Sequence, residues 1–265
     1  MHRLLLVPLL LLAAALSGCA PAVRPEPAAG FVTRSVEVDG VDHAYQVFVP
    51  GQRREPLPVV LFLHGSGERG DDNRAQTEAG LGPYLRAHAD AFPALVVFPQ
   101  SPRGRSWDGD VARVALAALD AASREFGGDA ARTYLTGMSR GGYGTWALAL
   151  DHPQRFAALA PVCGGLTNPP GRDDLAVEAV AGAPDPFAAA ASRLRGIPSW
   201  IFHGAQDDVV PPAQSRRMAD ALRAAGADVR YTEFPDANHN AWDPAYATPE
   251  LWAWLFAQRL HASVP

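Results

Sequence analysis

The sequence predicts one α/β domain in which helices flank a sheet of mostly parallel strands, and three observations lead to that fold class. Short apolar runs recur along the chain, as in strands that are buried on both faces. Longer segments with the apolar spacing of helices lie between these runs. A Gly-x-Ser-x-Gly pattern at residues 137–141 falls between one such run and one such segment, where a sharp turn from strand to helix is expected.

The predicted strands begin with a hairpin. Residues 35–38 and 44–49 alternate apolar and polar side chains around Asp39-Gly40, which favours an antiparallel pair at one edge of the sheet. Six apolar runs follow, at residues 59–63, 94–98, 133–135, 157–162, 199–202 and 229–234. The prediction is therefore a sheet of eight strands.

The predicted helices lie at residues 111–126, 142–150, 186–194, 213–225 and 249–260, several of them opened by proline or closed by glycine. Residues 166–186 form the longest stretch without clear periodicity. A loop of this length is usually functional or mobile, and it is too short for a lid domain, so we expect a small rim. Its charged residues Arg172, Asp173 and Asp174 are expected to be solvated.

Composition excludes several classes of function. The chain has 265 residues, of which 48% are hydrophobic, enough apolar material for one sizeable core. A net charge of -5 argues against a nucleic-acid partner. All 23 basic residues are arginine, which excludes Schiff-base chemistry and a lysine general base. With Cys19 and Cys163 as its two cysteines, the chain has neither a disulfide scaffold nor a cysteine-rich metal site.

The N-terminal segment has the features of a secretion signal. After Arg3, residues 4–16 form an unbroken apolar run that is too short to span a bilayer as a helix. The following Leu-Ser-Gly-Cys, which ends at Cys19, resembles the bacterial lipobox. That resemblance implies lipidation of Cys19 after cleavage; the alternative is an ordinary signal that is cut near Ala20.

We therefore predict three parts of the chain. Residues 1–18 are a lipoprotein signal peptide, residues 19–30 are a proline-rich tether, and residues 31–265 are the folded domain. The lipid on Cys19 would hold the domain on the periplasmic side of the cell envelope. Cys163 lies in an apolar run and is expected to be a buried small hydrophobic residue.

Ser139, at the centre of the Gly-x-Ser-x-Gly pattern, is the candidate nucleophile. The two flanking glycines are expected because side chains there would collide with the neighbouring strand and helix. The residues His64-Gly65-Ser66-Gly67 end another predicted strand and can aim a backbone N–H at an oxyanion. We predict the backbone N–H groups of Ser66 and Arg140 as the two donors, and a buried His64 that supports the loop.

Two later turns supply the other candidate groups. Asp207 and Asp208 follow a predicted strand, and Asp207 is the better candidate because it lies three residues after the glycine of the turn. Asp208 has the alternative role of a turn or cap residue. His239 follows the last strand on a polar loop and is the histidine placed to act as a base. The sequence lacks H-E-x-x-H and paired-cysteine spacing, so no metal is predicted.

These motifs resemble one known group of enzymes. Residues 31–263 are similar to esterases of the α/β-hydrolase superfamily, in the carboxylesterase and dienelactone-hydrolase-like group, and to the catalytic domains of prolyl-oligopeptidase-like hydrolases. The resemblance is carried by HGSGERGDDN at residues 64–73, by YLTGMSRGGYGTW at residues 134–146, and by the order serine, aspartate, histidine. Arg140 departs from it, since methionine is usual at that position, which affects the shape and charge of the pocket.

The resemblance implies an α/β-hydrolase fold with an eight-stranded, mostly parallel sheet and no large lid. It also implies no cofactor and a serine carboxylesterase that forms an acyl-enzyme. The lack of room for a full lid and of a long apolar tract after the signal predicts short-chain, aromatic or carbohydrate-linked esters as substrates. A serine peptidase and a non-catalytic envelope lipoprotein with the same fold remain as alternatives. Trp107, Tyr143 and Trp242 lie near the predicted carboxyl ends of strands, so we predict that they contact substrate, although any of them can instead belong to the core.

Overall fold

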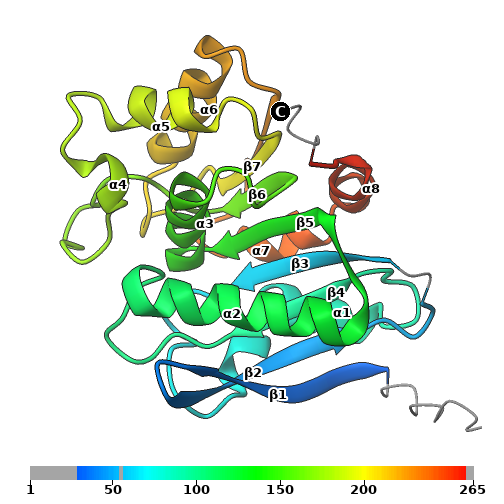
Figure 1. The fold of residues 1–265 in the computed structure, drawn as a ribbon. Helices are drawn as coiled ribbons and strands as arrows, with labels where there is room; N and C mark the ends of the chain where they lie inside the picture. The colour runs from blue at the N-terminus through cyan, green and yellow to red at the C-terminus, as the bar shows by residue number, and fades with distance from the viewer. Residues whose placement is uncertain (1–28, 54–55, 261–265) are drawn as a thin grey trace, which may run out of the picture.

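The computed structural model describes residues 29–53 and 56–260. Their sheet has eight strands in the order β1-β2-β4-β3-β5-β6-β7-β8 (Figure 1). β1 and β2 form the predicted antiparallel hairpin at one edge, β2 also pairs antiparallel with β4, and the remaining pairs are parallel. The strands are β1 (Gly30–Val38), β2 (Val41–Val49), β3 (Leu57–Leu63), β4 (Leu95–Pro99), β5 (Gly128–Met138), β6 (Ala158–Val162), β7 (Ser199–Gly204) and β8 (Val229–Phe234).

The central strands are buried on both faces, which explains their continuous apolar sequence. In β3 every side chain is buried, and successive residues point to opposite faces of the sheet. Leu61 therefore packs into the core on one face, whereas Phe62 packs into the core on the other. The predicted eight-stranded, mostly parallel sheet is confirmed.

Helices cover both faces of this sheet (Figure 1). One face packs against α2 (Gly109–Phe126), α3 (Arg140–Asp151), α4 (Glu178–Ala181), α5 (Pro186–Leu194) and α6 (Ala213–Ala224). The other face packs against α1 (Leu81–Ala87), α7 (Trp242–Tyr246) and α8 (Pro249–Ala257). A 3₁₀ helix, η1 (Ala75–Thr77), precedes α1.

The short helices α1, α4 and α7 were not predicted, because each is too short to show a helical period in the sequence. In α1 the pair Gly82-Pro83 also has low helix propensity. A Cβ at Gly82 would lie 2.0 Å from the Thr77 carbonyl oxygen, so close packing requires the glycine. α8 ends at Ala257 rather than at Leu260, whose N–H donates to the Ala131 carbonyl 2.8 Å away.

The predicted rim, residues 166–186, is packed onto the domain. It contains α4 and buries the side chains of Leu175, Val177 and Val180 against the core. Gly30, assigned from the sequence to the tether, is the first residue of β1. The predicted signal peptide and the lipidated Cys19 lie outside the described residues. None of the helices in the described part of the chain is long and apolar enough to cross a bilayer.

Candidate active site

The turn around Ser139 links β5 to α3 at the carboxyl edge of the sheet. Ser139 has φ 54° and ψ -119°, a strained backbone conformation that lifts its side chain out of the strand. A Cβ at Gly141 would lie 1.8 Å from the Leu63 carbonyl oxygen, and one at Gly137 would lie 2.3 Å from the Gly141 carbonyl oxygen. The turn therefore packs so closely against β3 that both flanking positions require glycine.

The structure brings Ser139, His239 and Asp207 together in one chain of hydrogen bonds. The Ser139 hydroxyl donates to Nε2 of His239 over 2.9 Å. Nδ1–H of His239 donates to Oδ2 of Asp207 over 2.7 Å. The His239 side chain is 18% exposed and that of Asp207 is fully buried, so the base can reach solvent while the acid cannot.

The carboxylate of Asp207 is fixed by further donors. Its Oδ1 accepts the backbone N–H groups of Val209 and Val210, each over 2.9 Å. Burial by itself raises the pKa of Asp207, but hydrogen bonds from His203, His239 and Val210 outweigh burial and hold the pKa well below its usual value. Asp207 is therefore ionised throughout the neutral range. Asp208 is exposed, and its side chain takes no part in this chain of hydrogen bonds.

The predicted oxyanion donors belong to two loops that meet at the nucleophile. A Cβ built on Gly65 would lie 3.5 Å from Cβ of Ser139, so the loop after β3 abuts the serine. Among the hydrogen bonds of the described residues, neither the Ser66 N–H nor the Arg140 N–H has an acceptor. Both groups can therefore donate to a substrate oxygen.

Known proteins are similar to this chain in sequence and in fold. The sequence pattern of the prolyl oligopeptidase family matches residues 176–258. NocK, a proposed esterase of Nocardia uniformis subsp. tsuyamanensis, is 29% identical over 79% of this chain and 64% of its own. The bifunctional acetylxylan esterase/xylanase XynS20E of Neocallimastix patriciarum is 28% identical over 64% of this chain and 22% of its own.

The crystal structure of a thermostable esterase superposes with a TM-score of 0.71 and 30% identity, covering 86% of this chain and 63% of that one. The chain has the α/β-hydrolase fold. It spans less than two thirds of the length of each of these relatives. The family pattern includes Asp207 and His239, whereas Ser139 lies before its first matched residue.

His64 supports the oxyanion loop of this α/β-hydrolase, as the sequence analysis expected. Its side chain is fully buried, Nδ1–H donates to the Gly65 carbonyl over 2.7 Å, and Nε2 accepts the Ser101 N–H over 3.0 Å. The Trp107 indole N–H donates to the His64 carbonyl over 3.0 Å. Burial lowers the pKa of His64 from 6.5 to about 4, so the imidazole is neutral at physiological pH.

A stability measurement can check this environment. Between pH 6.5 and about 4 the unfolded chain binds a proton at His64 and the folded chain does not. The free energy of unfolding is therefore expected to decrease as the pH is lowered from 6.5 to about 4, by about 3 kcal/mol in total. Urea unfolding at pH 7, 5.5 and 4.5 should show this loss in the His152→Gln control, whose histidine is exposed, and not in His64→Gln. Equal pH dependence in both variants would contradict the assignment.

The Arg140 side chain has a role that the sequence analysis missed. It is 2% exposed, and its Nε donates to Ser66 Oγ over 3.0 Å while Nη1 donates to Ser106 Oγ over 2.5 Å. Its Nη2 pairs with the carboxylate of Asp174. Asp174 is 59% exposed, as expected, but it also supplies the counter-charge that a buried guanidinium needs. The signal in the sequence was the arginine that stands where methionine is usual.

Arg172 also departs from the expectation of a purely solvated charge. Its Nη2 lies 3.4 Å from Ser66 Oγ, and its Nε lies 3.4 Å from Asp174 Oδ1. Two guanidinium groups thus contact the side chain of Ser66, whose N–H is a candidate oxyanion donor. The rim and the oxyanion loop are therefore in direct contact.

Of the three predicted pocket aromatics, the structure places one at the triad. The Trp242 ring meets the His239 ring edge-on, with centroids 5.4 Å apart. Trp107 and Tyr143 are buried, at 2% and 3% exposure, and the Tyr143 hydroxyl donates to the Thr167 carbonyl over 3.2 Å. Both therefore hold loops in place, which corrects the expectation that they form the substrate surface.

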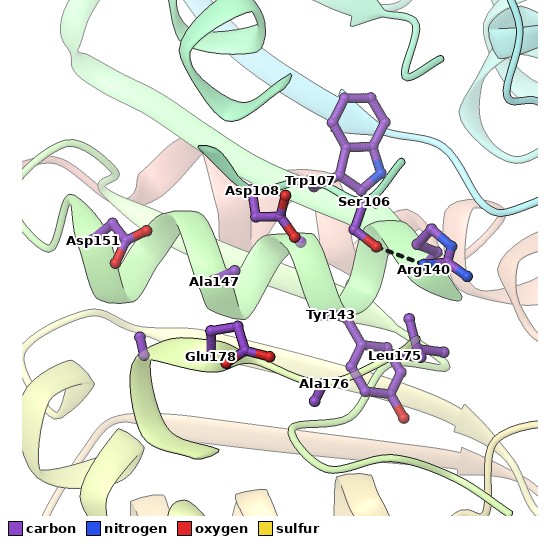
Figure 2. Close-up of a pocket in the computed structure, with 12 residues that line it drawn as sticks. Ser106, Trp107, Asp108, Arg140, Tyr143, Ala147, Asp151, Leu175, Ala176 and Glu178 are labelled. Carbon is purple, nitrogen blue, oxygen red and sulfur yellow. Dashed lines mark hydrogen bonds between the residues drawn. The ribbon is translucent and has the colours of Figure 1, made fainter. Parts of the chain in front are cut away.

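Trp107 and Tyr143 also line a cavity of about 50 Å³ beside α3 (Figure 2). Acidic side chains from three segments, those of Asp108, Asp151 and Glu178, stand around it. Ser139 and His239 are not among its lining residues. The cavity therefore borders the candidate active site through Arg140 and does not reach the reacting side chains.

Cys163 lies beneath the triad and is buried, as predicted. Atoms of Cys163, Asp207 and His239 that can bind a metal lie within 4.8 Å of one another. These groups do not fit a metal, because Nδ1 of His239 already donates to Asp207 and burial raises the pKa of the Cys163 thiol well above its usual value. The thiol instead contacts the His239 carbonyl at 3.2 Å.

Proposed function

We propose that this α/β-hydrolase is a serine carboxylesterase that works through an acyl-enzyme. The observation that carries the proposal is the continuous hydrogen-bonded chain from Ser139 through His239 to Asp207, beside two N–H groups without acceptors. This geometry suits nucleophilic attack on an ester carbonyl with removal of the serine proton.

The proposed reaction has two halves. Ser139 Oγ attacks the ester carbonyl carbon while His239 Nε2 takes the hydroxyl proton, and the N–H groups of Ser66 and Arg140 hold the oxyanion. The intermediate collapses, and the leaving alkoxide takes the proton from His239. Water then gives a proton to His239 and attacks the acyl-enzyme. As the acid leaves, Ser139 Oγ takes that proton back from His239, which regenerates both groups. Asp207 stays ionised and fixes the orientation of the imidazole.

We propose short-chain, aromatic or carbohydrate-linked esters as substrates. Among the described residues, the large hydrophobic side chains that are exposed are Val41 and Val209, which is little surface for a fatty chain. Each buried methylene contributes about 0.8 kcal/mol, so a long acyl chain needs an extensive apolar wall. Trp242 beside His239 offers one flat aromatic surface. Similarity to an acetylxylan esterase/xylanase supports the carbohydrate-linked class.

The test combines labelling with a substrate series. We expect a fluorophosphonate to label Ser139, and p-nitrophenyl acetate, a feruloyl ester or acetylated xylan to be cleaved more efficiently than p-nitrophenyl palmitate. Efficiency that rises steadily to palmitate, with activation at a lipid interface, would identify a lipase instead. Absence of labelling in a folded protein would support a binding protein.

A peptidase is the second candidate, because the prolyl oligopeptidase family pattern matches residues 176–258. A proline-containing peptide amide belongs in the same series for that reason. Faster cleavage of the amide than of the esters would replace the proposed esterase by a peptidase. The two activities use the same triad, so Ser139 labelling alone does not separate them.

We also propose that the domain is tethered to the cell envelope through a lipid on Cys19. The lipobox-like sequence that ends at Cys19 supports this location. The Cys19→Ala variant is expected to stay uncleaved or to become soluble, because it cannot be lipidated. Fractionation of cells that express each form checks this. A Cys19→Ala protein that is processed and held at the membrane like the wild type would contradict the tether.

A further inference from the structure

Two histidines lie beside the same carboxylate oxygen of Asp207. Nδ1 of His239 lies 2.7 Å from Oδ2, and Nε2 of His203 lies 3.1 Å from the same atom. His203 belongs to β7, and its side chain and that of Asp207 are both fully buried. The proposed mechanism gives this second histidine no role.

The neighbours of His203 determine which of its ring nitrogens carries the proton. Nε2 faces two acceptors, Asp207 Oδ2 and the Val210 carbonyl at 2.9 Å, so it must be an N–H donor. Nδ1 lies 2.7 Å from the hydroxyl of Ser215 on α6, which can donate to it. Ser215 is 3% exposed, so water does not compete for this contact.

We propose that His203 is a positioning residue for the triad acid: its Nε2–H, set by Ser215, holds the Asp207 carboxylate so that Oδ2 faces His239. The inference rests on the proposed function, because it concerns the acid of that reaction. A carboxylate rotates easily about its last bond, since that torsion has a broad, two-fold profile. Two backbone N–H groups fix Oδ1. Beside Oδ2, the described residues place the Nε2–H of His203, which it shares with the Val210 carbonyl, next to the catalytic base.

His203 also affects the charge that His239 meets. A donor on Oδ2 withdraws negative charge from the oxygen that stabilises the protonated His239. Without this donor His239 should hold its proton more tightly, so the acid limb of activity should move to higher pH. Other titratable groups face the pair: Tyr143 from α3 and Cys163 after β6 face Asp207, and Glu233 from β8 faces His203.

The test compares His203→Leu, which has no donor, with His203→Gln, whose amide keeps an N–H. Hydrolysis of p-nitrophenyl acetate is measured against pH in the full-length protein. We expect His203→Leu to lose about 10- to 100-fold in kcat with little change in KM, as for the loss of one hydrogen bond to a charged group. We expect its acid limb to move to higher pH, and His203→Gln to recover most of both effects.

Ser215→Ala provides a second route, which remains informative if His203→Leu does not fold. We expect a smaller loss of kcat and a shift of the acid limb in the same direction. Ser199→Ala is the matched control, since Ser199 is a fully buried serine of β7 that donates to the Ile197 carbonyl. We expect Ser199→Ala to keep the wild-type pH profile whatever it costs in stability.

Three outcomes would overturn the inference alone, provided that the wild type is labelled by a fluorophosphonate and hydrolyses the ester. They are a folded His203→Leu with wild-type kcat and profile, a loss of kcat with an unmoved acid limb, and a Ser215→Ala profile equal to that of Ser199→Ala. A folded wild type that neither labels nor hydrolyses would overturn the proposed function, and this inference with it.

Discussion

Ser139→Ala is expected to lower the turnover of p-nitrophenyl acetate by about 10⁴- to 10⁶-fold, because a triad loses nearly all of its effect when the nucleophile is removed. The fold should be unaffected. Ser139 lies at the surface end of β5, and the substitution keeps the Cβ that already fits the turn. Hydrolysis in single-turnover and steady-state assays measures the loss.

Circular dichroism and thermal unfolding serve as controls for Ser139→Ala. Labelling by a fluorophosphonate should disappear together with turnover, since both need the Oγ nucleophile. Near-normal hydrolysis by a correctly folded Ser139→Ala protein would mean that the reaction runs elsewhere on the molecule. The proposed esterase mechanism would then be wrong.

Asp207→Asn is expected to lower turnover by a factor on the order of 10⁴, as the same change does in the best-studied triad enzyme. The amide oxygen can still accept from Val209 and Val210, which places the NH₂ group against His239 Nδ1. Two donors then face each other, so His239 is driven to the wrong tautomer. Steady-state kinetics with an activated ester measures the effect.

Asp208→Asn is the matched control, because it removes the same charge at the next residue, whose side chain is exposed. We expect its activity to stay within a few-fold of the wild type. If Asp208→Asn were the more damaging substitution, the acid would have been assigned to the wrong neighbour. Equal damage from both would indicate a general charge effect instead of a triad acid.

The sheet and the longer helices could be predicted because their signals are local. A strand buried on both faces, such as β3, must be apolar throughout, and a long helix repeats its apolar positions every three or four residues. The same holds for Ser139, where the sharp turn itself demands the neighbouring glycines. Asp207 and His239 follow from their places at the ends of parallel strands, which meet at one edge of the sheet.

The remaining features depend on residues that are distant in the chain. Arg140 pairs with Asp174, and His203 contacts Ser215 from a different element, so no short pattern contains both partners. An aromatic residue near a strand end can face the core or solvent, and Trp107 faces the core because its indole N–H donates to the His64 carbonyl. Packing decides these cases after the local structure has formed.

The buried Arg140 guanidinium restricts how this protein can diversify. It contacts Ser66 in the oxyanion loop and Asp174 in the rim, so the part that would select substrates and the part that would accelerate the reaction share one ion pair. Replacing the rim by a loop from a related protein would leave the buried guanidinium without its counter-charge unless Arg140 changed with it. Substrate range should therefore be transferable between relatives when residue 140 and the rim are exchanged together. Laboratory evolution of substrate range should likewise select paired substitutions at residue 140 and in the rim.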